Sequence, residues 1–241
     1  MNQNRDLLIP AEWDSEFFGL KIARLAAMGP VEGRLTTGRE EAARQGIHCL
    51  FAELMADEVA LPNVPERVGY RLVDLATWMR APLPGDVPPN EPRVEVLEGG
   101  LADVASIGEA LSSLASWSKF ASDPRFGASA ARRVCRSWVE RSAASPDELF
   151  LIARIDGETA GFITCEVTPR PRICLIASTV QKAGVGRLLV GRAMDWAGAL
   201  GDELWVKASL RNAGALRFYE ACGFRIREIM YAYHLWIDEP S

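Results

Sequence analysis

The amino-acid sequence predicts an α/β fold, of the α+β type with a mixed sheet, in which helices pack on strands. Apolar runs with a period of two alternate with runs that have the spacing of amphipathic helices. Asp156-Gly157 joins two of the strand-like runs and is a pair that favours a two-residue hairpin turn. A third strand-like run leads through a glycine-containing turn into a helix, Val180–Trp196. With 241 residues, 49% of them hydrophobic, the chain can bury a substantial core.

A proline-rich segment divides the chain. Residues 81–92, APLPGDVPPNEP, hold five of the fourteen prolines, which is typical of a linker. We therefore expect an N-terminal domain over residues 1–84, a linker over 85–92 and a second domain over 93–241. Gly69–Leu72 (GYRL) aligns with Gly223–Ile226 (GFRI) between two strand-like runs in each case. This short match suggests that the N-terminal domain is a half-copy of the second, without its glycine loop. The alternative is a coincidence between two strand–helix–strand units.

The second domain reads as an ordered series of strands and helices. The expected order is strand, helix, helix, three strands, helix, strand, helix, strand. In residue ranges these are 92–100, 101–116, 128–143, the hairpin 148–167, 172–178, the helix after the glycine turn, 203–210, 212–223 and 224–237. Asn212 is expected to cap the last helix at its start, and Gly223 to follow its end.

Composition excludes several classes of protein. A formal charge of -5 argues against nonspecific binding to nucleic acid. No run approaches 18 apolar residues, and the N-terminus lacks the pattern of a signal peptide. The five cysteines are widely spaced without a CxxC pair, so we expect neither disulfides nor a metal site. These features predict a cytoplasmic protein that does not bind membranes.

The glycine turn is an anion site by its construction. Gly184 and Gly186 let the backbone approach a ligand closely, and the first N–H groups of the following helix point at it. The turn lacks the third glycine of a dinucleotide-binding GxGxxG loop and the GK[ST] of a Walker A loop. The pattern that remains is Gln181-x-x-Gly184-x-Gly186.

That pattern, followed by a helix, a strand, Asn212 and the helix NAGALRFYEACGF, resembles the GNAT superfamily of acyl-CoA N-acyltransferases over about residues 93–237. The resemblance implies acetyl-CoA as cosubstrate, with its pyrophosphate held by the loop amides. It implies these cofactor-binding residues: Ser178, Thr179, Val180, Gln181, Lys182, Ala183, Gly184, Val185, Gly186, Arg187 and Asn212.

Two further segments are similar to the dTDP-fucosamine (dTDP-4-amino-4,6-dideoxygalactose) acetyltransferase group. These are Trp13–Leu25 and Phe120–Ser142. That group acetylates the amine of a nucleotide-linked amino-deoxy sugar. A homodimer is also expected from relatives, and the strand 226–237 is a candidate for pairing across it.

Tyr219 is the candidate general acid. Acetyl transfer needs a proton for the leaving thiolate, and Tyr219 lies seven residues, or two helical turns, after Asn212. The resemblance assigns it the same role. The alternative is a core aromatic residue, since Leu216 and Cys222 flank it at helical spacing.

The acceptor side is less defined. Glu166 and Asp123 are candidate bases, although water alone could remove the proton from the amine. Phe120, Arg125 and Phe126 offer aromatic surface and charge suited to a nucleotide, or they simply pack this region. The acceptor could also be an antibiotic, a free amino sugar or a peptide amine, and the chain could be a CoA-binding module without turnover.

Overall fold

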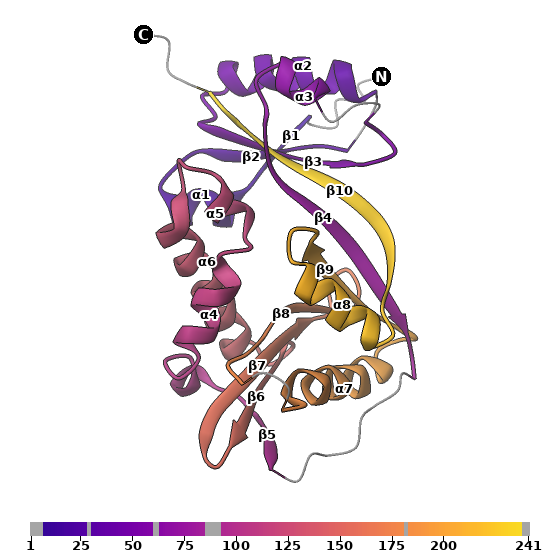
Figure 1. The fold of residues 1–241 in the computed structure, drawn as a ribbon. Helices are drawn as coiled ribbons and strands as arrows, with labels where there is room; N and C mark the ends of the chain where they lie inside the picture. Colours follow the sequence, from indigo (N-terminus) through magenta and orange to yellow (C-terminus); the bar gives the residue numbers. More distant parts are fainter. Residues whose placement is uncertain (1–6, 28–29, 60–62, 85–92, 181–182, 238–241) are drawn as a thin grey trace. The chain divides into compact units, whose positions relative to one another are not determined.

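The computed structural model describes residues 7–27, 30–59, 63–84, 93–180 and 183–237. It divides into two compact units, residues 1–76 with 228–241 and residues 77–227 (Figure 1). Helices and strands alternate in both units, which confirms the predicted α/β class with a mixed sheet. The expected linker, residues 85–92, lies outside the described residues, and the division at that point stays a prediction.

The first unit contains the N-terminal elements and the last strand. In chain order they are β1 (Leu8–Pro10), α1 (Glu12–Phe18), β2 (Ile22–Leu25), α2 (Val31–Arg44), β3 (Cys49–Met55), α3 (Val64–Arg67), the start of β4 (Arg71–Pro82) and most of β10 (Arg225–Trp236). The strand order is β1-β2-β3-β10-β4. β2 and β3 are parallel, whereas β3 and β10 are antiparallel with Met55 opposite Met230. Leu35, Leu50 and Tyr233 lie in its core.

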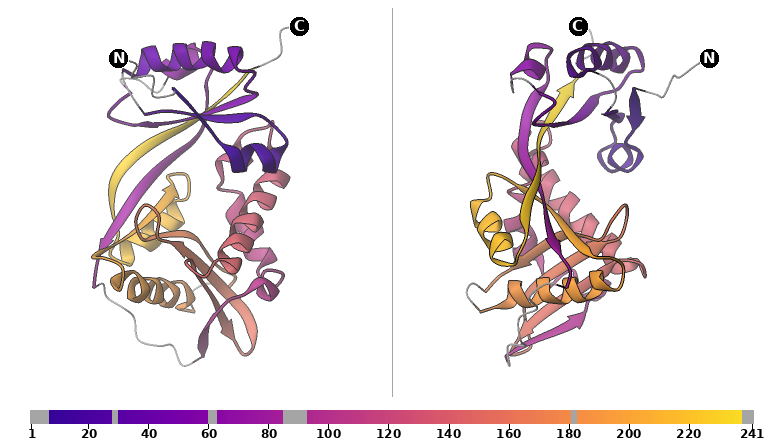
Figure 2. Two further views of the ribbon diagram at one scale, coloured as in Figure 1. Left: turned by 180° about the vertical axis from the view of Figure 1, so that it is seen from behind. Right: turned by 90° about the vertical axis from the view of Figure 1, so that its right-hand side faces the viewer.

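The second unit contains the remaining elements. They are the end of β4, β5 (Val94–Glu98), a 3-10 turn (Leu101–Asp103), α4 (Gly108–Ala115), α5 (Lys119–Ser122), α6 (Gly127–Ala144), β6 (Leu149–Ile155), β7 (Glu158–Glu166), β8 (Arg172–Ser178), α7 (Val185–Gly198), β9 (Glu203–Ser209), α8 (Ala213–Ala221) and the start of β10. The strand order is β4-β9-β8-β7-β6-β5. Figure 2 shows this arrangement from two further directions.

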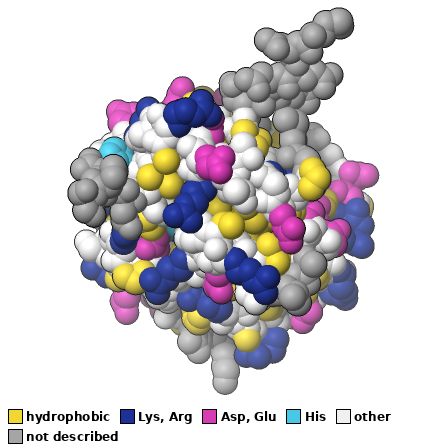
Figure 3. Space-filling model, turned by 90° about the horizontal axis from the view of Figure 1, so that it is seen from above, with side chains coloured by type: hydrophobic (Ala, Val, Ile, Leu, Met, Phe, Trp, Pro, Cys, Tyr) yellow, Lys and Arg dark blue, Asp and Glu magenta, His cyan; other side chains and the backbone are white. Residues whose placement is uncertain are grey.

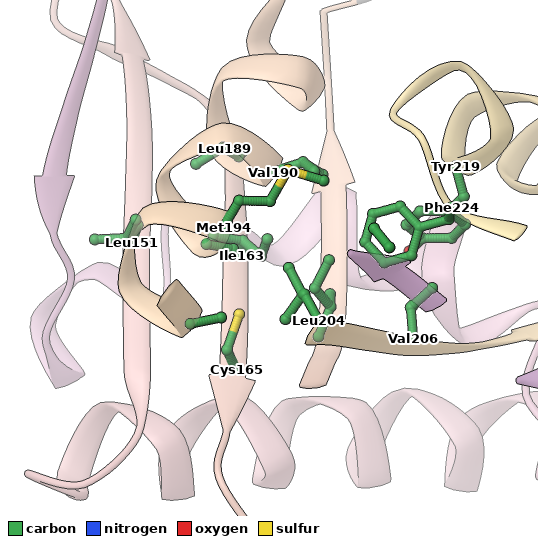
Figure 4. Close-up of a cluster of buried hydrophobic side chains, with 14 of the residues drawn as sticks. Leu151, Ile163, Cys165, Leu189, Val190, Met194, Leu204, Val206, Tyr219 and Phe224 are labelled. Atoms are coloured by element: carbon green, nitrogen blue, oxygen red, sulfur yellow. The ribbon is translucent and has the colours of Figure 1, made fainter. Parts of the chain in front are cut away.

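Helix α7 covers one face of this sheet. Leu189 and Val190 of α7 pack on apolar side chains that alternate along β6, β7 and β9, among them Leu151, Ile163 and Val206 (Figure 4). Met79 of β4 belongs to the same core. Helices α4 and α6 pack on strands β6 to β8 of this unit without contributing to that core.

Local turn chemistry agrees with the sequence. Asp156 and Gly157 both have positive φ, 52° and 84°, as the predicted hairpin turn requires. The side chain of Asn212 caps α8, and Gly223 follows the helix with φ of 88°. The predicted helix over 101–116 is shorter than expected, because a 3-10 turn and bends precede α4.

The elements of the two units follow the same plan. Helix α2, strand β3 and strand β4 begin at residues 31, 49 and 71; helix α7, strand β9 and strand β10 begin 154 residues later, at 185, 203 and 225. Each pair has the same length: 14, 7 and 12 residues. Gly69 and Gly223 share a positive φ at this same offset.

The outer side of α2 is a solvated surface. Its exposed positions include Glu32, Arg39, Glu40 and Arg44. Viewed from above, charged side chains of both signs intermingle with small groups of hydrophobic ones (Figure 3). Within the described residues, no helix is long and apolar enough to cross a membrane.

Candidate active site

Strands β8 and β9 separate after a short paired segment. They are parallel neighbours, but their register covers only Arg172 with Trp205 and Ile173 with Val206. The pairing of β7 with β8 is also irregular here, shifting between Thr164 and Cys165. From Cys174 to the end of β8, the edge that faces β9 is therefore open to another hydrogen-bonding chain.

The turn after β8 ends at a helix N-terminus. Gly184 is the N-cap of α7 with φ of 74°, a left-handed conformation that favours glycine. No side chain of a described residue caps this helix, and its geometry leaves the N–H groups of Val185, Gly186 and Arg187 without intrahelical acceptors. These groups and the helix dipole are suited to binding an anion, as the sequence predicts. Gln181 and Lys182 lie outside the described residues.

The end of β8 is tied to β7. The amide of Thr179 donates to the carbonyl of Ala160 at 2.9 Å. The hydroxyl of Ser178 donates to the Val180 carbonyl at 2.7 Å, with the Ala160 carbonyl at 3.0 Å. Ser178, Thr179 and Val180 are exposed, and Ala183 is half-buried. These bonds fix the strand end from which the anion-binding turn departs.

Gly161 allows the close approach of β8 and α7. A Cβ at this position would lie 2.7 Å from the Ala177 carbonyl oxygen and 2.9 Å from a methyl group of Val185. Gly161→Ala is therefore expected to destabilise the fold by about 1–3 kcal/mol, because backbone must move to relieve the overlap. Thermal unfolding would measure the loss.

Gly198→Ala is the matched control, since a Cβ there meets nothing within 4 Å. We expect its melting temperature to equal or exceed that of the wild type. An unchanged melting temperature in Gly161→Ala would show that this close contact does not constrain the strand end.

Asn212 has the expected place at the start of α8. Its side-chain oxygen accepts from the amide of Ala215 at 3.0 Å. The NH₂ group of the same side chain is a separate donor. The N-cap role and a cofactor contact are thus compatible in one residue.

Tyr219 is buried in the core of the second unit, with 6% of its surface exposed. Its ring packs against Phe218 and Phe224, at centroid distances of 5.3 and 5.5 Å (Figure 4). Burial raises the pKa of the phenol well above its ordinary value, and the nearby Cys165 and Cys222 add to that rise. The hydroxyl is absent from the buried unpaired polar atoms of the described residues and makes no hydrogen bond among them. Its raised pKa keeps this hydroxyl protonated at neutral pH, so that it can donate a proton.

The predicted acceptor residues separate into buried and exposed ones. Phe120 and Asp123 are each 1% exposed. The carboxylate of Asp123 accepts from the amide of Arg125 at 3.0 Å, which caps the turn before α6. Arg125 is exposed and Phe126 is half-buried, with its ring 5.3 Å from that of Phe120. Of these four residues, Arg125 and Phe126 are the ones with surface exposed.

Glu166 is held by arginines. It accepts from Arg172 at 2.7 Å, and Arg141 lies 3.4 Å away. It ends β7 opposite Arg172 at the start of β8, whereas the anion-binding turn follows the other end of β8. The structure thus places Glu166 and the turn at opposite ends of one strand.

A second cluster of side chains on the sheet was not predicted from the sequence. Three cations surround the indole of Trp78: Arg170 at 5.6 Å, Arg172 at 5.7 Å and Lys207 at 5.8 Å from the ring centroid. Arg170 also stacks on Trp205 at 3.7 Å. We call these five residues the aromatic–cationic patch. These residues come from distant parts of the chain. The sequence shows only that those on β4 and β9 alternate with core residues.

A cavity of about 460 Å³ lies elsewhere, between α7 and the end of α8. Arg187, Met194, Cys222 and Arg225 are among its lining residues, whereas Asn212 and Tyr219 are not. We therefore place the chemistry at the open edge of β8 and not in this cavity. Among the described residues, no group of three or more His, Cys, Asp or Glu could hold a metal ion.

Comparison with known proteins relates part of the chain to one family. The sequence model described as the Acetyltransferase (GNAT) family matches residues 113–224. A search of curated proteins found no match.

Three solved structures share the fold. One, described as functionally unknown, is from Staphylococcus epidermidis, with a TM-score of 0.68, 13% identity and coverage of 90% of this chain and 85% of that one. A GCN5-related N-acetyltransferase from Kribbella flavida has a TM-score of 0.61, 18% identity and coverage of 89% and 81%. A tandem GNAT protein from the clavulanic acid biosynthesis pathway has a TM-score of 0.58, 13% identity and coverage of 92% and 77%.

The opening between β8 and β9 and the start of α7 both lie within the segment that the family model matches. Residues 113–224 match the GNAT acetyltransferase family and the fold is GNAT-like, which together support an acetyl-CoA-dependent N-acetyltransferase.

Proposed function

We propose that this protein transfers the acetyl group of acetyl-CoA directly to the amine of a nucleotide-linked amino-deoxy sugar, as in the dTDP-fucosamine acetyltransferase group. The observation that carries the proposal is the opening between β8 and β9, which begins after Ile173 and Val206 and ends beside the N-terminus of α7. An extended thioester can add to the open edge of β8 while its phosphates reach that helix.

The cosubstrate contacts follow from this placement. The backbone of Ala183 to Arg187 would bind the pyrophosphate. Gln181 and Lys182, which lie outside the described residues, are assigned to the same role by the family pattern. Ser178, Thr179 and Val180 would border the pantetheine arm, and the amide of Asn212 would donate to it. The charge of exposed Arg187 adds to the helix dipole.

The reaction needs few side chains. The neutral amine attacks the thioester carbon, a C–N bond forms and the oxyanion is bound by backbone N–H groups on the open edge of β8. The C–S bond then breaks, and Tyr219 gives its proton to the leaving thiolate. The ammonium proton leaves through water, because Glu166 is engaged by two arginines and Asp123 is buried.

Direct transfer is favoured over an acetyl-cysteine intermediate. Cys174 is the cysteine on the open part of β8, and its pKa is raised to about 12, chiefly by burial and further by Glu166. A thiol that stays protonated at neutral pH is a poor nucleophile. We therefore expect no acetylated enzyme when acetyl-CoA is supplied alone.

We expect Tyr219 to stay protonated over the pH range of an activity assay, so that its deprotonation does not affect kcat. A raised pKa keeps this acid protonated below the ordinary tyrosine pKa of about 10. We expect kcat to show no alkaline decline from this group up to about pH 10. A pH profile of kcat under saturating substrates would measure it, and a decline centred near pH 8 that persists in Cys222→Ser would contradict the assignment.

Mass spectrometry of an acceptor panel tests the function. We expect a 42-mass-unit gain, about the mass of one acetyl group, on nucleotide 4-amino-6-deoxy sugars, and no transfer to aminoglycosides or short peptides. Transfer to another amine would keep the mechanism and replace the acceptor. Acetyl-CoA binding without any product would identify a binding module.

We also propose that residues 1–84 are a partial GNAT-like domain in a cytoplasmic homodimer. The shared plan at an offset of 154 residues supports the first part. Light scattering would give the oligomeric state.

A further inference from the structure

The aromatic–cationic patch occupies one face of the sheet in the second unit. Trp78 precedes Met79, and Trp205 lies between Leu204 and Val206; these neighbours belong to the core under α7. Because side chains alternate along a strand, both indoles project from the face opposite α7. Trp78, Arg170 and Lys207 are half-buried, so part of the patch meets solvent.

The patch borders the opening where acetyl transfer is placed. Arg172 and Trp205 form one of the two residue pairs that join β8 to β9, and the next pair, Ile173 with Val206, is the last before the strands part. Lys207 follows directly on β9. A molecule on the patch would therefore lie one or two residues, about 3–7 Å along the strand, from the start of the open edge.

One cation of the patch, Arg170, lacks a carboxylate partner within the described residues, whereas Arg172 has one. Arg172 pairs with Glu166, and Glu203 interacts with Arg80 and with the indole N–H of Trp205. The guanidinium of Arg170 lies instead 3.7 Å from the centroid of the Trp205 ring. An acidic chain of net charge -5 thus concentrates three cations around one indole.

We infer that the aromatic–cationic patch binds the nucleoside diphosphate part of the acceptor, with Arg170 and Lys207 on the phosphates and Trp78 against the base. This inference rests on the proposed function and names the residues that would select its acceptor. Guanidinium groups pair with phosphate oxygens in a bidentate manner, and indoles stack on bases. When Arg170 and Lys207 turn from the indole of Trp78 toward the phosphates, the face of that indole becomes available to the base.

The test uses the full-length protein saturated with CoA, so that the α7 site is filled. Titration with a thymidine or uridine diphosphate, followed by calorimetry and tryptophan fluorescence, should show binding in the wild type. Arg170→Ala should weaken it roughly 10- to 100-fold, the loss expected for a hydrogen bond to a charged group. Trp78→Phe should reduce the fluorescence change.

Arg132→Ala is the matched control, because Arg132 is an exposed arginine of α6 outside the patch. It should bind the nucleotide as the wild type does. With the nucleotide amino sugar as substrate, Arg170→Ala should raise the acceptor KM by the same factor and leave the acetyl-CoA KM unchanged.

The outcomes separate the two proposals. Acetylation of the nucleotide sugar with an unaltered acceptor KM in Arg170→Ala and Trp78→Phe would overturn the patch and leave the function intact. Nucleotide binding that is lost when CoA saturates the enzyme would also overturn it. Acetylation of other amines alone, with no nucleotide binding in the wild type, would overturn both.

Discussion

Replacing Tyr219 with phenylalanine is expected to lower kcat about 10²- to 10⁴-fold, the contribution of a positioned acid. The substitution removes one oxygen and keeps the ring that packs against Phe218 and Phe224. The hydroxyl makes no hydrogen bond within the described residues, so its removal leaves no partner unsatisfied among them. Acetyl-CoA affinity and the melting temperature should therefore change little, and the loss should fall on kcat.

Tyr70→Phe is the control for this experiment. Tyr70 is also buried, and its hydroxyl donates to the carbonyl of Leu35 at 3.1 Å in the first unit. Losing this bond should cost about 0.5–1.5 kcal/mol of stability and leave kcat unchanged. If kcat is equal for Tyr219→Phe and the wild type, water and not Tyr219 protonates the leaving thiolate. Tyr219 would then serve only to pack the core.

Residues 93–241 expressed alone are expected not to fold. This fragment lacks β4, which lies next to β9, and with it Met79 and Ala81 of the core under α7. It also leaves Met230–Trp236 of β10 without β3. An exposed core edge and an unpaired strand both favour aggregation. We expect loss of the cooperative thermal transition and of activity.

Co-expression with residues 1–84 is the control. That fragment supplies β3 and β4, so we expect the two pieces to co-purify and to recover acetyl transfer. A cooperative transition and full activity in residues 93–241 alone would instead show that the division at 85–92 separates independent domains.

Local features of the fold were predictable because they depend on neighbouring residues. Asp156-Gly157 forms its hairpin turn, and Asn212 caps α8, as their backbone and side-chain chemistry requires. The glycine turn likewise leads into a helix at Gly184. The membership of the end of β4 in the second unit was not predictable, since nothing in its own alternation specifies which strand lies beside it.

The acceptor side shows the same limit. Phe120 and Asp123 have the composition of a ligand site, but short-range pattern does not distinguish a ring that lines a surface from one that fills a core. Trp78, Arg170 and Trp205 meet only after β4, the β7–β8 turn and β9 assemble. Their proximity depends on long-range topology, which periodicity does not encode.

The pairing of β3 with β10 sets the order in which the chain can fold as it is made. Met55 pairs with Met230, 175 residues further along (230 minus 55). At a synthesis rate of about 5–20 residues per second, the edge of β3 waits about 9–35 s for its partner. That edge carries the apolar sequence CLFAELM, a template for pairing with other nascent chains. The first unit therefore completes its sheet only after the second has been synthesised. The N-terminal segment leaves the ribosome first but is the last to complete its strand pairing.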